Sequence, residues 1–227
     1  MNVLRVLLVF LALGTLAFAS STILIFDASG SMADSVSGTG KTKIEIAKEA
    51  GNTFLNNVNS GDEVALIVFY DCGDIKTEVP FTTDFQQIRD KMAGLTPQSS
   101  TPIAKSIDYA ANYAQTSGKS GAAIIILTDG EETCDSHSDA VTSAQNAVSG
   151  GAVKIINVVG FTVGNTTSTN LQEIATAGKG NYYGANDAGQ LAASLTQAYQ
   201  SGSGTCCLPS MGLPALVGAA IFFSRKR

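Results

Sequence analysis

Short apolar runs alternate along the chain with segments whose apolar residues recur every three or four positions. The runs predict buried β-strands, and the helical spacing predicts amphipathic helices between them. Strands are expected at residues 22–26, 63–69, 75–81, 122–127, 153–159 and 181–183, and helices at 41–58, 84–92, 102–114, 138–148, 169–177 and 187–199. Nearly continuous apolar strands separated by helices are typical of a parallel sheet covered on both faces, so we predict a doubly wound α/β fold.

One predicted strand differs from the others. Residues 75–81 alternate in polarity and contain Pro80, which suits an edge of the sheet because proline cannot donate a ladder hydrogen bond. The expected architecture is therefore a mostly parallel central sheet with one antiparallel edge strand and helices on both faces.

The first residues are typical of a secretory signal. Arg5 precedes an apolar run over residues 6–18, and Ala17-Phe18-Ala19 fits a small-residue cleavage site. An uncleaved anchor is the alternative, but the run is short for a span, which needs about 20 apolar residues. We expect a signal peptide at 1–19, one folded domain at 20–200, a linker at 201–207 and a hydrophobic sorting or anchor segment at 208–227.

The C-terminal end has a similar layout in reverse. Ser201-Gly202-Ser203-Gly204 predicts a flexible linker, residues 211–223 are apolar, and Arg225-Lys226-Arg227 closes the chain with positive charge. This layout resembles the sorting tails that envelope transpeptidases process, although Met211 stands where a sortase signal has threonine. A short tail anchor is the alternative, and both predict a secreted protein held at the membrane or cell envelope.

The net charge of the predicted domain limits the kinds of molecule that it is expected to bind. The formal net charge is −5, and four basic residues lie in the two end segments, which contain no acid, so the domain between them is more acidic than the whole chain. An acidic domain repels phosphate backbones, so nucleic-acid binding is not expected. Such a domain is compatible with a divalent cation, because hard cations seek oxygen ligands.

Oxygen-bearing side chains gather where predicted strands end. Asp27 and Asp129 follow two of the most apolar strands, Ser29 and Ser31 lie in the sharp loop after Asp27, and Thr101 is expected as the N-cap of a helix that begins with Pro102. Ligands of such sheets bind at the carboxyl ends of strands. Two carboxylates and three hydroxyls suit Mg²⁺, and Mn²⁺ or Ca²⁺ could substitute.

Three separated motifs resemble those of one family. Asp27-Ala28-Ser29-Gly30-Ser31, Thr101 and Thr128-Asp129-Gly130 look like the three parts of the metal ion-dependent adhesion site of von Willebrand factor type A domains, over about residues 21–200. The resemblance implies that Ser29 and Ser31 bind the metal directly and that Thr101, Asp27 and Asp129 bind directly or through water. It also implies an open coordination position for a carboxylate of the partner.

The residues after Asp129 add a further resemblance. Residues 129–134 are similar to the secreted microbial branch of that family, in which a cysteine near the position of Cys72 is frequent. Since secretion permits disulfides, we predict a bond between Cys72 and Cys134, with a buried thiol or a redox pair as alternatives. Glu131 and Glu132 are expected to be solvated charges, with a role at the rim of the metal site as the alternative.

The leading hypothesis for function is a non-enzymatic binding or adhesion module whose protein or peptide ligand offers an Asp or Glu carboxylate. A metal-dependent hydrolase or phosphatase is the first alternative, although no general base is evident and the one histidine, His137, lies in a polar stretch. A structural subunit of a surface assembly is the second.

Overall fold

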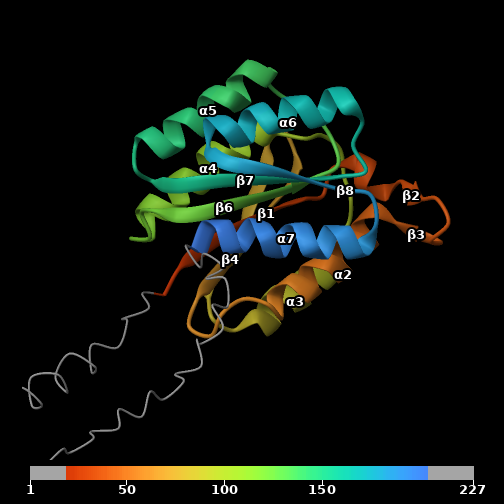
Figure 1. Cartoon of the computed structure of the whole chain (residues 1–227), viewed down its shortest axis with the longest axis horizontal. Coiled ribbons are helices and arrows are strands. Elements are labelled where there is room, and N and C mark those ends of the chain that lie inside the picture. Colours follow the sequence, from red (N-terminus) through yellow and green to blue (C-terminus); the bar gives the residue numbers. More distant parts are fainter. Residues whose placement is uncertain (1–18, 204–227) are drawn as a thin grey trace, which may run out of the picture.

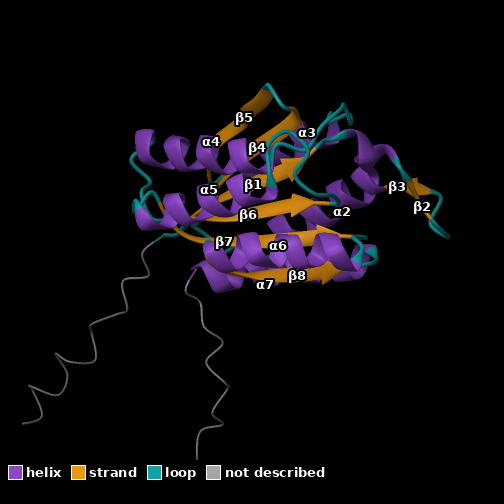
Figure 2. Cartoon of the chain, turned by 90° about the horizontal axis from the view of Figure 1, so that it is seen from above, coloured by secondary structure: helices purple, strands orange, loops and turns teal. Residues whose placement is uncertain are grey.

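A six-stranded sheet forms the centre of the domain, with the strand order β5-β4-β1-β6-β7-β8. The computed structural model describes residues 19–203. The strands are β1 (Ser21–Asp27), β4 (Glu63–Asp71), β5 (Asp74–Thr82), β6 (Ala122–Thr128), β7 (Val153–Phe161) and β8 (Lys179–Ala185). Neighbouring strands are parallel except for β4 and β5, so the predicted sheet and its antiparallel edge strand are confirmed (Figure 2).

Helices cover both faces of this sheet (Figure 1). One face carries α4 (Ile103–Thr116), α5 (His137–Ser149) and α6 (Asn165–Ala177), and the other carries α2 (Lys43–Leu55), α3 (Phe85–Ala93) and α7 (Ala188–Ser203). Strand β1 shows why the strands are apolar throughout. Its side chains alternate between the two cores, Ile23 and Ile25 into one and Leu24 and Phe26 into the other. The doubly wound α/β prediction is confirmed.

A small protrusion beside the sheet was not predicted. The short 3-10 helix η1 (Gly30–Ala33) leads into a two-stranded hairpin of β2 (Ser35–Val36) and β3 (Lys41–Thr42), which extends from the body of the domain (Figures 1 and 2). Helix α2 therefore begins at Lys43 rather than at 41. A capping box fixes this start, because Thr42 and Glu45 exchange side-chain and backbone hydrogen bonds.

The end of the domain corrects the predicted linker. Residues 201–203 are not a flexible connection but the last turn of α7. Packing decides this: Gly202 is buried, and a Cβ atom there would lie 2.8 Å from the Cβ of Ala123 in β6. The buried amide of Asn157 in β7 also donates to Ala198 O and Ser201 Oγ at 2.7 and 2.8 Å.

The expected signal peptide at 1–19, apart from Ala19, and the remaining linker and anchor segment at 204–227 lie outside the described residues. None of the helices within residues 19–203 is both long and apolar enough to cross a membrane.

Candidate functional site

The candidate site lies at the carboxyl edge of the sheet, between β1 and β6. Strand β1 has β4 on one side and β6 on the other, so the chain's winding reverses direction here, which is the usual place for a ligand in an α/β sheet. Asp27 is the last residue of β1, and Asp129 follows β6 directly. The sheet alone therefore brings two acidic residues that are 102 positions apart to one edge.

Asp27 is fully buried, and both of its oxygens accept hydrogen bonds. Oδ1 accepts from the backbone N of Ser29 at 2.7 Å, and Oδ2 accepts from Thr128 Oγ1 at 2.6 Å. Burial raises the pKa of Asp27 to about 6; the negative charge of Asp129 adds to the shift, and the hydrogen bonds from Ser29 and Thr128 oppose it. Two carboxylates thus lie close enough to repel each other in a buried position.

A chain of hydroxyls joins the two acidic residues. Ser29 Oγ lies 3.2 Å from Ser31 Oγ, and Ser31 Oγ donates to Asp129 Oδ1 at 2.7 Å. Ser29 and Asp129 are buried and Ser31 is partly exposed, so the row is accessible from the surface at Ser31. The structure brings these four predicted residues together.

Thr101, in the segment before α4, also lies beside the site. A Cβ atom added at Gly130 would lie 3.9 Å from both Ser31 Oγ and Thr101 Oγ1, so the two hydroxyls flank this glycine. The prediction that Thr101 is the N-cap of α4 is wrong, because Pro102 takes that position. Its backbone is instead held by Thr133: Thr101 N donates to Thr133 Oγ1 at 2.7 Å, and Thr133 N donates to Thr101 O at 3.0 Å.

The sequence interpretation missed one charged residue of the site. Lys43 Nζ donates to Asp129 Oδ2 at 2.7 Å and lies 3.5 Å from Asp34 Oδ2. Burial alone would lower the pKa of Lys43, but Asp129 and Asp34 outweigh burial and raise it. A signal was present in the sequence, because a lysine in the first turn of a helix opposes the helix dipole unless an acidic partner is near.

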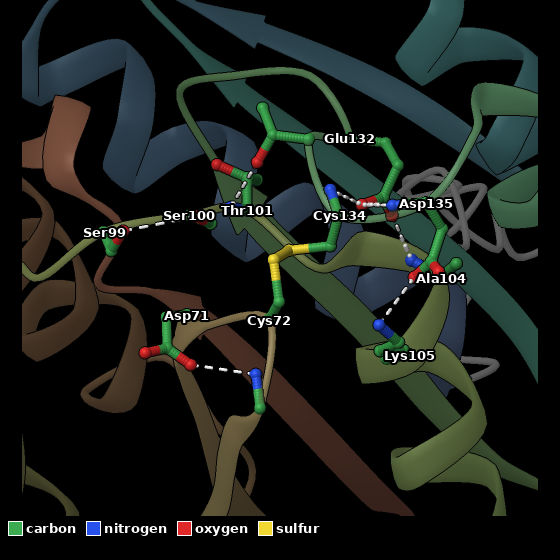
Figure 3. Close-up of a disulfide and its surroundings, with 12 residues drawn as sticks. Asp71, Cys72, Ser99, Ser100, Thr101, Ala104, Lys105, Glu132, Cys134 and Asp135 are labelled. Carbon is green, nitrogen blue, oxygen red and sulfur yellow. Dashed lines mark hydrogen bonds and ion pairs between the residues drawn. A yellow bond between two sulfur atoms is a disulfide. The ribbon is translucent and has the colours of Figure 1, made fainter.

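The predicted disulfide between Cys72 and Cys134 is present, with 5.4 Å between the two Cα atoms. It joins the turn after β4 to the loop after β6, next to Thr101 (Figure 3). The same loop corrects the expectation of a solvated Glu132. This carboxylate accepts from Ala104 N in the first turn of α4 at 2.6 Å and from Cys134 N at 2.8 Å.

Glu131 is not simply solvated either, because its Oε1 accepts from Thr167 Oγ1 at 2.7 Å. His137 pairs with Glu173, with 2.8 Å between His137 Nε2 and Glu173 Oε2.

The donor set decides which metal the site could hold. Within residues 19–203 no three His, Cys, Asp or Glu side chains come together as a metal cluster. The candidate ligands are two carboxylates and three hydroxyls, all oxygen, which fits a hard cation such as Mg²⁺ and not a soft one. Two mutually repelling carboxylates in a buried position add to the fit, because a cation between them would relieve the repulsion.

Comparison with known proteins agrees with the geometry. Residues 22–132, which contain all five candidate ligands, match the family model described as von Willebrand factor type A domain. The fold is that of a von Willebrand factor type A domain. The chain is 26% identical over 183 residues to the uncharacterized protein YwmD of Bacillus subtilis, covering 74% of this chain and 80% of that protein.

Solved structures share the VWA fold at low sequence identity. The conserved hypothetical protein BatB from Bacteroides thetaiotaomicron superposes with a TM-score of 0.67 at 23% identity, covering 82% of this chain and all of that one. The vWF domain of the type V pili tip protein Mfa5 from Porphyromonas gingivalis gives a TM-score of 0.66 at 16% identity, with coverages of 82% and 96%.

Proposed function

We propose that this VWA domain binds a partner protein or peptide through a divalent cation, Mg²⁺ in the first place, held by Asp27, Ser29, Ser31, Thr101 and Asp129. The observation that carries the proposal is the continuous row Ser29 Oγ, Ser31 Oγ and Asp129 Oδ1, which begins beside the buried Asp27, passes the partly exposed Ser31 and ends at the buried Asp129. The row supplies both the charge and the neutral oxygens that a hard cation needs.

The partner's recognition group would be a carboxylate. When bound, the cation would offer an electrophilic coordination position to an incoming Asp or Glu side chain. The chain's own residues favour this, because three of the five donors are uncharged hydroxyls that do not neutralise the cation. The buried position of Asp27 also excludes water from the inner side of the site.

We propose a binding module rather than a hydrolase. The chain has one histidine, and its ring pairs with Glu173 on α6 rather than with a site residue. Hydrolysis needs a general base within hydrogen-bond reach of the attacking water. The similarity in fold to a pilus tip protein supports a role in surface adhesion or surface assembly.

The two ends of the domain support an orientation on the envelope. Ser20 N donates to Asp62 Oδ1, and the hydroxyl of Tyr199 near the end of α7 donates to Asp62 Oδ2. Both ends therefore leave the sheet at the amino edge, opposite Asp27. A chain anchored there would present the candidate site away from the membrane.

Capture from envelope extracts tests this function. The purified protein should retain a partner in Mg²⁺ and release it in chelator, and the double variant Ser29→Ala/Ser31→Ala should capture nothing. Ser37→Ala is the matched control, since Ser37 lies exposed on the β2–β3 hairpin. Converting the partner's carboxylates to amides should abolish capture. Equal capture in Mg²⁺ and in chelator would refute metal-mediated recognition.

A further inference from the structure

The side chain of Lys43 lies between two acidic residues of very different exposure. Its Nζ is 2.7 Å from Asp129 Oδ2 and 3.5 Å from Asp34 Oδ2. The Asp129 side chain is 0% exposed, that of Lys43 is 16% exposed, and that of Asp34 is 67% exposed. The ammonium thus connects a candidate metal ligand with a carboxylate in water.

The backbone of Lys43 is fixed, whereas its side chain is long. Lys43 N donates to Asp34 O at 2.9 Å, and the capping box of Thr42 and Glu45 sets the start of α2. These contacts hold the Cα atom in place. Four methylene groups leave the ammonium free to exchange one carboxylate for the other without a change in the fold.

We propose that Lys43 is the internal counter-ion of Asp129, that it competes with the divalent cation, and that it turns to Asp34 when the cation binds. The proposal rests on the proposed function and adds the regulation of that site. It assigns Lys43 and Asp34 as positioning residues that set metal affinity without binding the metal.

Charge explains why the two cations compete. In the structure both oxygens of Asp129 accept hydrogen bonds, since Ser31 Oγ donates to Oδ1 and Lys43 Nζ donates to Oδ2. A divalent ion beside Asp129 would lie next to the ammonium, and like charges at such distances repel strongly where water is excluded. Binding therefore requires the ammonium to leave Asp129, and Asp34 provides a nearby acceptor.

The ammonium also accounts for the stability of a metal-free site. A buried carboxylate without a cation is costly, whereas a charge-assisted hydrogen bond offsets much of that cost. Lys43 thus keeps the domain folded when metal is scarce and weakens metal binding by the same contact.

The test compares Lys43→Met with Lys41→Met by Mg²⁺ titration calorimetry and thermal unfolding. Lys41 is the matched control, because its Nζ pairs at 2.6 Å with Glu49 and both side chains are about half exposed. Lys43→Met should bind Mg²⁺ roughly tenfold or more tightly than the wild type, since the competing charge-assisted bond is gone. In chelator it should melt at a lower temperature, and Mg²⁺ should raise its melting temperature more than that of the wild type.

A second variant covers the case in which Lys43→Met fails to fold. Asp34→Asn leaves the buried pair intact but removes the negative charge of the alternative acceptor, so Mg²⁺ affinity should fall severalfold. Asp34 is exposed, and folding should be unaffected.

The outcomes separate the two proposals. Equal Mg²⁺ affinity in the wild type, Lys43→Met and Asp34→Asn would overturn the counter-ion proposal while leaving the metal site in place. Measurable Mg²⁺ binding in Lys43→Met and in neither of the other two proteins would support the counter-ion proposal most strongly. Absence of Mg²⁺ binding in all variants would overturn the proposed function and the competition with it.

Discussion

The disulfide between Cys72 and Cys134 gives the most quantitative prediction. The two cysteines are 62 positions apart, and the segment between them contains β5, α3, α4 and β6. In the chain-entropy account, closing a loop of this length stabilises the folded state by about 4 kcal/mol, because it restricts the unfolded chain. That is a large share of the free energy of unfolding of a folded domain, which is roughly 5–15 kcal/mol.

The perturbation is the double variant Cys72→Ala/Cys134→Ala, measured by urea unfolding. Both cysteines are partly exposed, so their side chains contribute little packing and the loss should come from the cross-link. With a denaturant slope of about 2 kcal/mol per molar, the urea midpoint should fall by roughly 2 M. The wild type with reductant should behave like the variant.

The site offers a second readout of the same variant. Cys134 lies in the loop whose residues Glu132 and Thr133 hold Ala104 N and the backbone of Thr101. Amide exchange at Thr101 should therefore accelerate more than exchange in β7. A decrease in the free energy of unfolding smaller than about 1 kcal/mol would refute the entropic reasoning, which predicts a decrease several times larger.

Three further predictions concern single side chains. Asn157→Ala should lower the free energy of unfolding by roughly 2–4 kcal/mol, because the buried hydrogen-bonding groups that the Asn157 amide pairs with lose their partner. Urea unfolding measures this loss, and amide hydrogen exchange should become faster first at the end of α7. Tyr199→Phe should be destabilising at neutral pH. Burial alone would raise the pKa of Asp62, but hydrogen bonds from Tyr199 and Ser20 outweigh burial and lower the pKa. The stability that these hydrogen bonds add is therefore present above the pKa of Asp62 in the unfolded chain, and it is lost as the pH falls through the lower pKa in the folded protein. The difference between wild type and variant in unfolding scans should therefore shrink below about pH 4, and a constant difference would contradict this assignment. Thr133→Val should weaken Mg²⁺ binding severalfold in calorimetry, because the backbone of Thr101 loses the Thr133 hydroxyl as an acceptor; unchanged affinity would show that Thr101 needs no such support.

The sequence predicted the parts of this domain that depend on local pattern. Strand β6 is buried between two helical layers and is apolar from Ala122 to Leu127, and such a run is visible without any structure. Asp27, Ser29 and Ser31 were predicted because Asp27 ends β1 and the two serines follow it closely. Asp129 was found because parallel strands end at a common edge.

The sequence did not predict contacts set by tertiary packing. Lys43 meets Asp129, 86 positions away, and the carboxylate of Glu132 meets Ala104 N, 28 positions away. No local pattern specifies such pairs. Gly202 was assigned to a linker on composition, whereas its lack of a side chain is what lets α7 pack closely on Ala123.

We propose above all that one divalent cation is held by oxygens from the end of β1 and the residues after it, from Thr101 before α4, and from Asp129 after β6. Titration of the purified protein with Mn²⁺, followed by electron paramagnetic resonance and competed with Mg²⁺, tests it most directly. We predict one bound ion per chain, displaced by Mg²⁺ and lost in Ser29→Ala/Ser31→Ala without a large change in melting temperature. Wild-type protein that leaves all Mn²⁺ free, or a double variant that binds it equally well, would contradict the account.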